Sequence, residues 1–133
     1  MARCFIPCVL VLSVVLPLAC GSENIIMGYI TGSQRLNDNS YYKRPGQQIS
    51  GALTMALDEI NADKSILPGY TLNFTFMETY GLELLSLKAT VELLNQNVSA
   101  YIGPQETCRH EAKVAAAFNR PMISYVSQQP HIV

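Results

Sequence analysis

The sequence predicts an α/β domain with a parallel sheet in the order 2-1-3-4 and helices on both faces of the sheet. Short apolar runs of strand length alternate with longer segments whose apolar residues recur every three or four positions. That alternation is typical of parallel strands joined by crossover helices. The first and third strands are apolar on both sides, which suits central positions, whereas the second strand alternates, which suits an edge.

The first strand and the first helix are the clearest elements. Residues 25–30 are a continuous apolar run, and the polar segment 31–44 follows it. Pro45 suits the first turn of a helix. The N–H groups of that turn have no acceptor within the helix, so proline, which lacks an N–H group, loses no hydrogen bond there. Beyond Pro45 one helical face is apolar, and it consists of Ile49, Ala52, Leu53, Ala56, Leu57 and Ile60.

The later elements repeat the pattern. Residues 70–77 alternate, with Tyr70, Leu72, Phe74 and Phe76 on one side, and this predicts a half-exposed strand. A second helix is marked by Leu84, Leu87, Val91 and Leu94. A third strand at 98–102 precedes a third helix, which is marked by Ala112, Ala115, Ala116 and Phe118. A short fourth strand at 122–125 follows Pro121.

Residues 1–21 have the pattern of a secretory signal: one positive charge at Arg3, an apolar stretch broken by Pro17, and small residues before the exit. A membrane-spanning helix is the first alternative, but about 14 apolar positions fall short of the roughly 20 that a span needs. A bacterial lipoprotein signal with Cys20 as the lipidated residue is the second, and Pro17 disfavours it. We therefore expect a secreted or extracellular chain.

The part after the leader carries signals of extracellular chemistry. Asn73 and Asn97 each begin an Asn-x-Ser/Thr glycosylation motif. Cys108 is the one cysteine beyond the leader, and we expect it to form a disulfide with a partner that the sequence does not identify. The net charge of −1 gives no basic surplus for phosphates, which argues against a nucleic-acid partner.

The predicted strand order reverses direction between the first and third strands. Ligands of open α/β sheets bind at such a reversal, beyond the carboxyl ends of the strands. The candidate site therefore consists of the loops at 31–34, 78–81, 103–107 and 124–125. Within it the candidate ligand-binding residues are Thr31, Gly32, Ser33, Thr79, Tyr80, Gly103, Pro104, Gln105, Glu106, Ser124 and Tyr125.

No constellation of residues predicts catalysis or a metal. Cys108 and His110 are two positions apart on a helix, so their side chains point in different directions. The zinc pattern His-Glu-x-x-His fails because position 114 is Val114. Glu106 begins the predicted third helix, where a carboxylate either caps the helix or contacts a ligand. We expect no enzyme, no catalytic residue and no metal site.

Particular strings in the sequence carry a family resemblance. They include Gly103-Pro104 after the third strand and Ile123-Ser124-Tyr125 near the end. These strings resemble the ligand-binding region of natriuretic peptide receptors and, more closely, of invertebrate receptor guanylate cyclases. The resemblance extends over residues 25–125, and its matching segments are 28–32, 44–52, 56–61, 67–70, 100–108 and 120–125.

The resemblance implies a type I periplasmic-binding-protein-like fold, in which two lobes enclose a cleft. Residues 22–125 would be the opening part of lobe 1, and 126–133 an irregular tail that is truncated or alternatively spliced. The intact receptor would be a single-pass plasma-membrane homodimer that senses a peptide or another extracellular ligand, with its cyclase domain outside this chain. We predict that this chain alone binds such a ligand weakly or not at all, since it supplies one wall of the cleft.

Two further functions remain open at the level of sequence. One is a bacterial-type solute-binding lipoprotein or class C receptor lobe that binds an amino-acid-like ligand, and the other is a secreted decoy that pairs with the full receptor.

The resemblance also implies a bound chloride near residues 103–108. In the vertebrate receptors a cysteine follows the Gly-Pro pair at once and bridges to the preceding loop. Here Cys108 comes four residues after Pro104, and 78–85 has no cysteine.

Overall fold

The computed structural model describes residues 22–36, 41–104 and 108–125. These residues form a four-stranded sheet in the order β2-β1-β3-β4, as the sequence predicts. β1 (Glu23–Thr31) pairs in parallel with β2 (Tyr70–Glu78) along its whole length. On its other side β1 pairs with β3 (Ala100–Ile102), which in turn pairs with β4 (Met122–Ile123).

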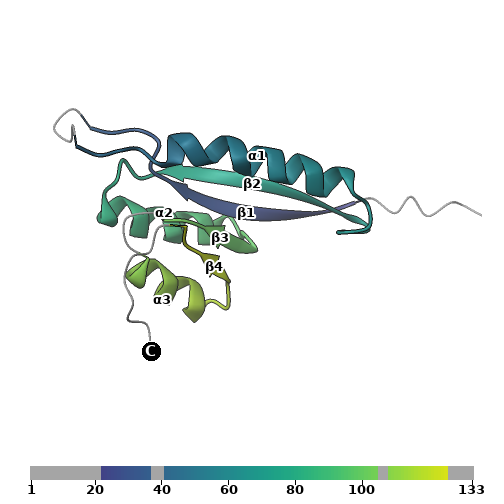
Figure 1. Ribbon diagram of the computed structural model, residues 1–133. Helices are drawn as coiled ribbons and strands as arrows, with labels where there is room; N and C mark the ends of the chain where they lie inside the picture. Colours follow the sequence, from purple (N-terminus) through teal and green to yellow (C-terminus); the bar gives the residue numbers. More distant parts are fainter. Residues whose placement is uncertain (1–21, 37–40, 105–107, 126–133) are drawn as a thin grey trace, which may run out of the picture.

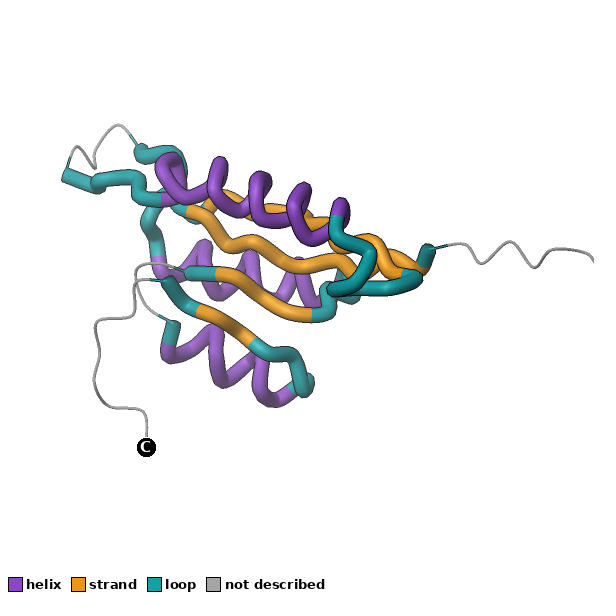
Figure 2. Tube along the Cα trace, turned by 45° about the vertical axis from the view of Figure 1, so that its right-hand side comes forward, coloured by secondary structure: helices purple, strands orange, loops and turns teal. Residues whose placement is uncertain are grey.

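Helices cover both faces of the sheet (Figure 1). α1 (Gly46–Ala62) lies on one face, and α2 (Glu83–Asn95) and α3 (Arg109–Ala117) lie on the other. The same layering is visible after rotation of the view, with the strands between α1 and the pair formed by α2 and α3 (Figure 2). All pairings are parallel, so the carboxyl ends of the strands meet at one rim, and the loops of the candidate site start there.

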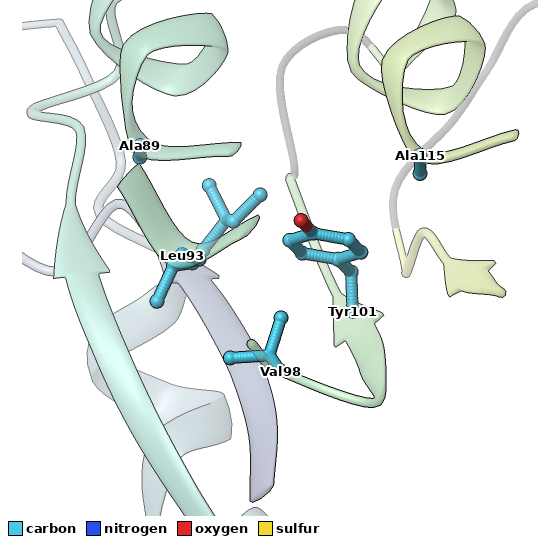
Figure 3. Close-up of a cluster of buried hydrophobic side chains, with 6 residues drawn as sticks. Ala89, Leu93, Val98, Tyr101 and Ala115 are labelled. Carbon is cyan, nitrogen blue, oxygen red and sulfur yellow. The ribbon is translucent and has the colours of Figure 1, made fainter. Parts of the chain in front are cut away.

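The buried core lies between the sheet and the α2–α3 face. It consists of Ile30, Ala89, Leu93, Val98, Tyr101 and Ala115, each at most 2% exposed. Figure 3 shows the Tyr101 ring between the side chains of α2 and α3. Gly28 makes this approach possible, because a β-carbon there would lie 3.1 Å from Leu93 and 3.2 Å from Tyr101. Close packing of this kind accounts for most of the stability that a small domain gains on folding.

α2 buries a different face from the one that its large apolar residues suggest. The buried positions are Ser86, Ala89, Thr90 and Leu93, whereas Leu84 is 77% exposed and Val91 is 43% exposed. Small side chains let α2 approach the sheet closely enough for the Tyr101 hydroxyl to donate to the Thr90 carbonyl at 3.0 Å. The sequence pattern locates this helix correctly, but its buried face combines Leu93 with three small side chains that the spacing of the large apolar residues does not indicate.

The α1 face is covered less completely. Leu57 is the large apolar side chain of α1 that is buried, and Ala52 and Ala56 of the predicted apolar stripe are exposed. Beneath this face Phe76 remains 61% exposed and Ile123 70% exposed. β2 is the edge strand that the sequence predicts, but exposure does not alternate along it, since Tyr70 and Phe76 of its apolar side and Asn73 of its polar side are all exposed. β3 and β4 are shorter than the predicted 98–102 and 122–125.

Candidate functional site

Four loops meet at the carboxyl rim of the sheet, and hydrogen bonds hold them together. The strands end at Thr31, Glu78, Ile102 and Ile123. The Thr79 amide donates to the Thr31 carbonyl at 2.8 Å, which joins the loops after β2 and β1. The Gly103 amide donates to the Ile123 carbonyl at 2.9 Å, which joins the loops after β3 and β4.

Glu78 is the polar centre of the rim between β1 and β2. Its carboxylate accepts hydrogen bonds from the Ser33 amide, at 3.1 Å and 3.0 Å to its two oxygens, and from the Ser33 hydroxyl. Oε1 also accepts from the amides of Thr79 at 3.1 Å and Tyr80 at 2.9 Å. Bonds from several donors to one carboxylate are strong because the acceptor is charged. Glu78 therefore fixes two of the candidate loops relative to each other.

A second set of contacts fixes the loop between β1 and α1. The Gly32 carbonyl accepts from the Gly46 amide and from the Tyr42 hydroxyl, each at 3.3 Å. A methyl group on Gly46 would collide with Thr31 Oγ1, so glycine is needed for α1 to start this close to β1. The Tyr42 ring in turn lies against Gly81, whose φ of 75° belongs to the left-handed region.

The loops after β3 and β4 are anchored on β1. Gly103 has a φ of 92°, and a side chain there would collide with the Ile30 carbonyl. That same carbonyl accepts from the Tyr125 hydroxyl at 3.3 Å. The Ser124 hydroxyl donates to the Pro104 carbonyl at 2.9 Å. The segment 103–104 and the end of β4 are therefore held against the central strand.

Burial divides the expected ligand-binding residues into two groups. Five are buried and form the framework of the rim: Thr31, Gly32, Thr79, Gly103 and Pro104. The half-buried ones, which present atoms to solvent at the rim, are Ser33, Tyr80, Ser124 and Tyr125. Gln105 and Glu106 lie outside the described residues. Glu78 was not among the expected residues, although a carboxylate at the last position of a strand on this rim was a signal that could have indicated it.

Cys108 and His110 do not form a nucleophile pair. Cys108, at the start of α3, is a half-buried free thiol. His110 Nδ1 lies 2.8 Å from Glu83 Oε1, which links α3 to the first turn of α2 on the exposed surface. Among the described residues, no three His, Cys, Asp or Glu side chains gather closely enough to hold a metal ion. The disulfide partner expected for Cys108 stays a prediction.

The chloride that the resemblance implies near residues 103–108 stays a prediction, because 105–107 lie outside the described residues. Glu111 lies in the first turn of α3, is fully buried, and neither of its carboxylate oxygens has a hydrogen-bond partner. An anion at the amino end of a helix is favoured by the exposed amides and the helix dipole. The Glu111 carboxyl group lies in this same turn, yet none of those amides donates to it.

Both glycosylation motifs lie away from the rim. Asn73 is exposed on β2, where its side-chain amide donates to the Asn24 side chain at 3.3 Å. Asn97 is exposed after α2, and its side-chain oxygen accepts from Arg120 at 2.8 Å. A hydrogen bond of 3.3 Å between Thr75 and Gln96 joins β2 to the end of α2, so both motifs occupy the same region. Glycans on both asparagines would leave the rim accessible.

The fold and the rim together define a class of protein. A parallel sheet in this order, with its loops tied at the carboxyl rim, is the beginning of a lobe of the type I periplasmic-binding-protein fold. The substrate-binding protein LivJ from Streptococcus pneumoniae, solved with isoleucine, matches 81% of this chain with a TM-score of 0.70. The match covers 30% of LivJ at 21% identity, so the likeness establishes the fold.

Sequence comparison gives the family. The family model described as "Receptor family ligand binding region" matches residues 48–132, a range that runs beyond Tyr125. The chain belongs to this family.

Receptor guanylate cyclases are among the relatives of the chain. Gyc76C of Drosophila melanogaster is 44% identical over 62% of this chain, and guanylate cyclase 32E of the same fly is 30% identical over 86%. The resact receptor of Arbacia punctulata is 31% identical over 82% of this chain.

The chain spans only a small part of these relatives: 5% of Gyc76C, 10% of guanylate cyclase 32E and 11% of the resact receptor. The part that it spans is the ligand-binding region that the family model describes. Within the described residues, none of the helices is both long and apolar enough to cross a membrane.

Proposed function

We propose that this chain is the opening part of lobe 1 in the extracellular ligand-binding region of a receptor guanylate cyclase, following a signal peptide at 1–21. The main support for the proposal is the rim. Hydrogen bonds to Glu78 join the loops after β1 and β2, and the hydrogen bond from the Gly103 amide joins the loops after β3 and β4. Ser33, Tyr80, Ser124 and Tyr125 then face the ligand cleft, while the cyclase domain lies outside this chain. The exposed glycosylation motifs at Asn73 and Asn97 suit an extracellular location.

A peptide is the favoured ligand class. Two relatives are named as receptors for resact and speract, and the half-buried candidate residues of the described rim are two serines and two tyrosines, beside the Glu78 carboxylate whose hydrogen bonds go to the loops themselves. Such side chains suit hydrogen bonding and packing along a peptide better than the capture of a free amino acid, whose two charges call for opposite charges. Isoleucine, the ligand of LivJ, is the probe for that alternative.

A chimeric receptor tests the proposal. The resact receptor segment that matches this chain is replaced by the corresponding residues of this chain, and binding of labelled resact is measured on cells. The chimera is expected to reach the surface, because the two segments belong to one family, and to bind resact at least about tenfold more weakly, because they are only 31% identical over 109 residues.

Reversion then identifies the contacts. Restoring the resact receptor's own residues at the rim positions 33, 80, 124 and 125 should recover part of the binding. Restoring them at 109 and 113, two exposed positions of α3, is the matched control and should recover none. Equal recovery by both sets, or unchanged binding in the first chimera, would contradict the proposal. Micromolar isoleucine binding by this chain would favour the amino-acid alternative.

We infer that the intact receptor pairs as a homodimer through an outward apolar row on α2. The row consists of Leu84, Leu87, Val91 and Leu94, of which Leu84 is 77% exposed. Spacings of three and four residues align these side chains along one side of the helix. Exposed apolar rows of this kind are typical of association surfaces, and a second copy of the receptor presents a complementary row.

The pairing is tested by a double substitution, Leu84→Glu with Val91→Glu, in the receptor ectodomain. Sedimentation velocity is expected to show a shift from dimer to monomer, because the charges would be desolvated at the interface. Arg109→Glu with Lys113→Glu, at two exposed positions of α3, is the control. A dimer that persists with the α2 substitutions as well as with the control substitutions would refute this interface.

A secreted decoy role requires that this chain co-purify with the ectodomain.

A further inference from the structure

A pocket lies between α1 and the first two strands, on the face opposite the core. Its volume is about 320 Å³, at the lower end of the range for small-molecule sites. The strands contribute Tyr29, Phe74 and Phe76, and α1 contributes Ser50 and Thr54. All lining residues fall within 29–76, so the first β-α-β unit builds the pocket without help from the rest of the chain.

The strand side of the pocket is aromatic. The rings of Tyr29 and Phe74 meet edge to face, with centroids 6.3 Å apart and an interplanar angle of 79°. Phe76 extends this wall and remains 61% exposed. Aromatic rings prefer such offset or edge-to-face partners, so a third ring would fit against this wall. The exposed area of Phe76 is apolar surface that an occupant would cover.

The helix side of the pocket offers hydrogen-bond acceptors. The Ser50 hydroxyl donates its hydrogen to the Gly46 carbonyl at 2.5 Å, and the Thr54 hydroxyl donates to the Ser50 carbonyl at 3.2 Å. The Tyr29 hydroxyl lies 3.3 Å from Ser50 Oγ, and because the Ser50 hydrogen is already used, Tyr29 is the donor of that pair. These hydroxyls therefore direct their hydrogens into the protein and keep lone pairs for a ligand.

The lining carries no charge at neutral pH, because it consists of hydroxyl, amide and aromatic side chains, with Gln34, Thr31 and Ser33 completing it. A charged ligand would lose its hydration here without gaining a partner of opposite charge. These properties favour a small, neutral occupant with an aromatic ring for the strand wall and a hydrogen-bond donor for the hydroxyl oxygens of α1.

We propose that this pocket binds a neutral aromatic molecule with one hydrogen-bond donor, of the phenol or indole class. The ring packs against Phe74 and Phe76, and the O–H or N–H group donates to the hydroxyl oxygens of Ser50 or Thr54. Ser33 belongs both to this pocket and to the rim, so an occupant contacts the loop that Glu78 holds. The pocket borders the rim through Thr31 and Ser33, and its test uses probes other than the receptor ligand.

Four probes test the chemistry on the full secreted chain by isothermal titration calorimetry. Indole and p-cresol are expected to bind. Toluene, which lacks the donor, should bind at least about fivefold more weakly, as expected for one lost hydrogen bond. Benzoate, which is charged, should not bind measurably. Equal affinity for toluene and p-cresol, binding of benzoate, or no heat with indole and p-cresol at millimolar concentration would overturn the proposal.

Matched variants locate the site. Phe76→Ala should weaken indole binding about fivefold through the loss of one aromatic contact. Phe118→Ala is the control, because Phe118 is 59% exposed on the other side of the sheet, just after α3. Circular dichroism verifies that each variant folds. If Phe76→Ala does not fold, Thr54→Leu replaces it, because Thr54 lines the pocket and a larger side chain there reduces its volume. Identical indole affinity in Phe118→Ala and in the folded pocket variant would refute the site.

Discussion

The two faces of the sheet differ in how far this chain completes them. On the α2–α3 face, Leu93 and Ile30 are fully buried and Tyr101 is 1% exposed. On the α1 face, one helix covers β1 and β2, and Ile123, Phe76 and Met55 remain 70%, 61% and 64% exposed. One face is therefore a finished core, whereas the other holds a pocket and uncovered apolar surface. We conclude that the α2–α3 face contributes most of the stability of this fold.

The largest effect should come from opening the finished core. Leu93→Ala removes a fully buried side chain that packs beside Tyr101 and is expected to lower the free energy of unfolding by about 2–5 kcal/mol. Phe76→Ala, on the other face, should cost less than about 1 kcal/mol, since most of its ring is already in water. Urea unfolding of the secreted chain, followed by circular dichroism, measures both. Equal losses would show that the α1 face stabilises the fold as much as the α2–α3 face does.

A smaller and pH-dependent effect is expected at Tyr101. Burial raises the pKa of its phenol above 10.0, and the charge of Arg120 partly offsets this. The folded state then retains a proton that the unfolded state loses, so the contribution of Tyr101 to stability is complete below pH 10 and declines as the pH rises through the folded-state pKa.

Tyr101→Phe separates this effect from packing. At pH 7 it should cost about 1 kcal/mol, because the hydrogen bond to the Thr90 carbonyl is lost. Above pH 10 the difference between the two proteins should shrink, since the variant has no phenol to ionise. Tyr70→Phe, on an exposed residue of β2, serves as the control for alkaline titration. A constant difference from pH 7 to pH 11 would show that the environment of Tyr101 does not favour its protonated form.

Particular residues show how far the sequence alone leads. The continuous apolar run at 25–30 and the alternation at 70–77 were enough to place β1 in the centre and β2 at the edge, because burial on two faces and on one face leave different patterns. Pro45 marked the start of α1 correctly. The rim was located by the strand order, and Gly103 does lie against β1. Which residues of the rim contact a ligand stays a prediction.

The sequence could not show which side of α2 is buried or that Glu78 is the centre of the rim. Both depend on distances between segments that are far apart in the chain. The spacing of Leu84 and Val91 marks the helix, but Ser86 and Ala89 are the residues that lie buried against the sheet and Tyr101. Glu78 is one carboxylate among several in the sequence, and its role appears when the loop after β1 brings Ser33 to it.

The order of elements, the parallel sheet and the family were determined by the sequence itself, because local periodicity and short motifs carry that information residue by residue. The covered and uncovered faces, the acceptor-lined pocket beneath α1 and the carboxylate that joins two loops were decided by tertiary structure. The physical reason is that volume, solvent exposure and hydrogen-bond partners are properties of the space between elements, and that space is defined when the strands pair and the helices pack.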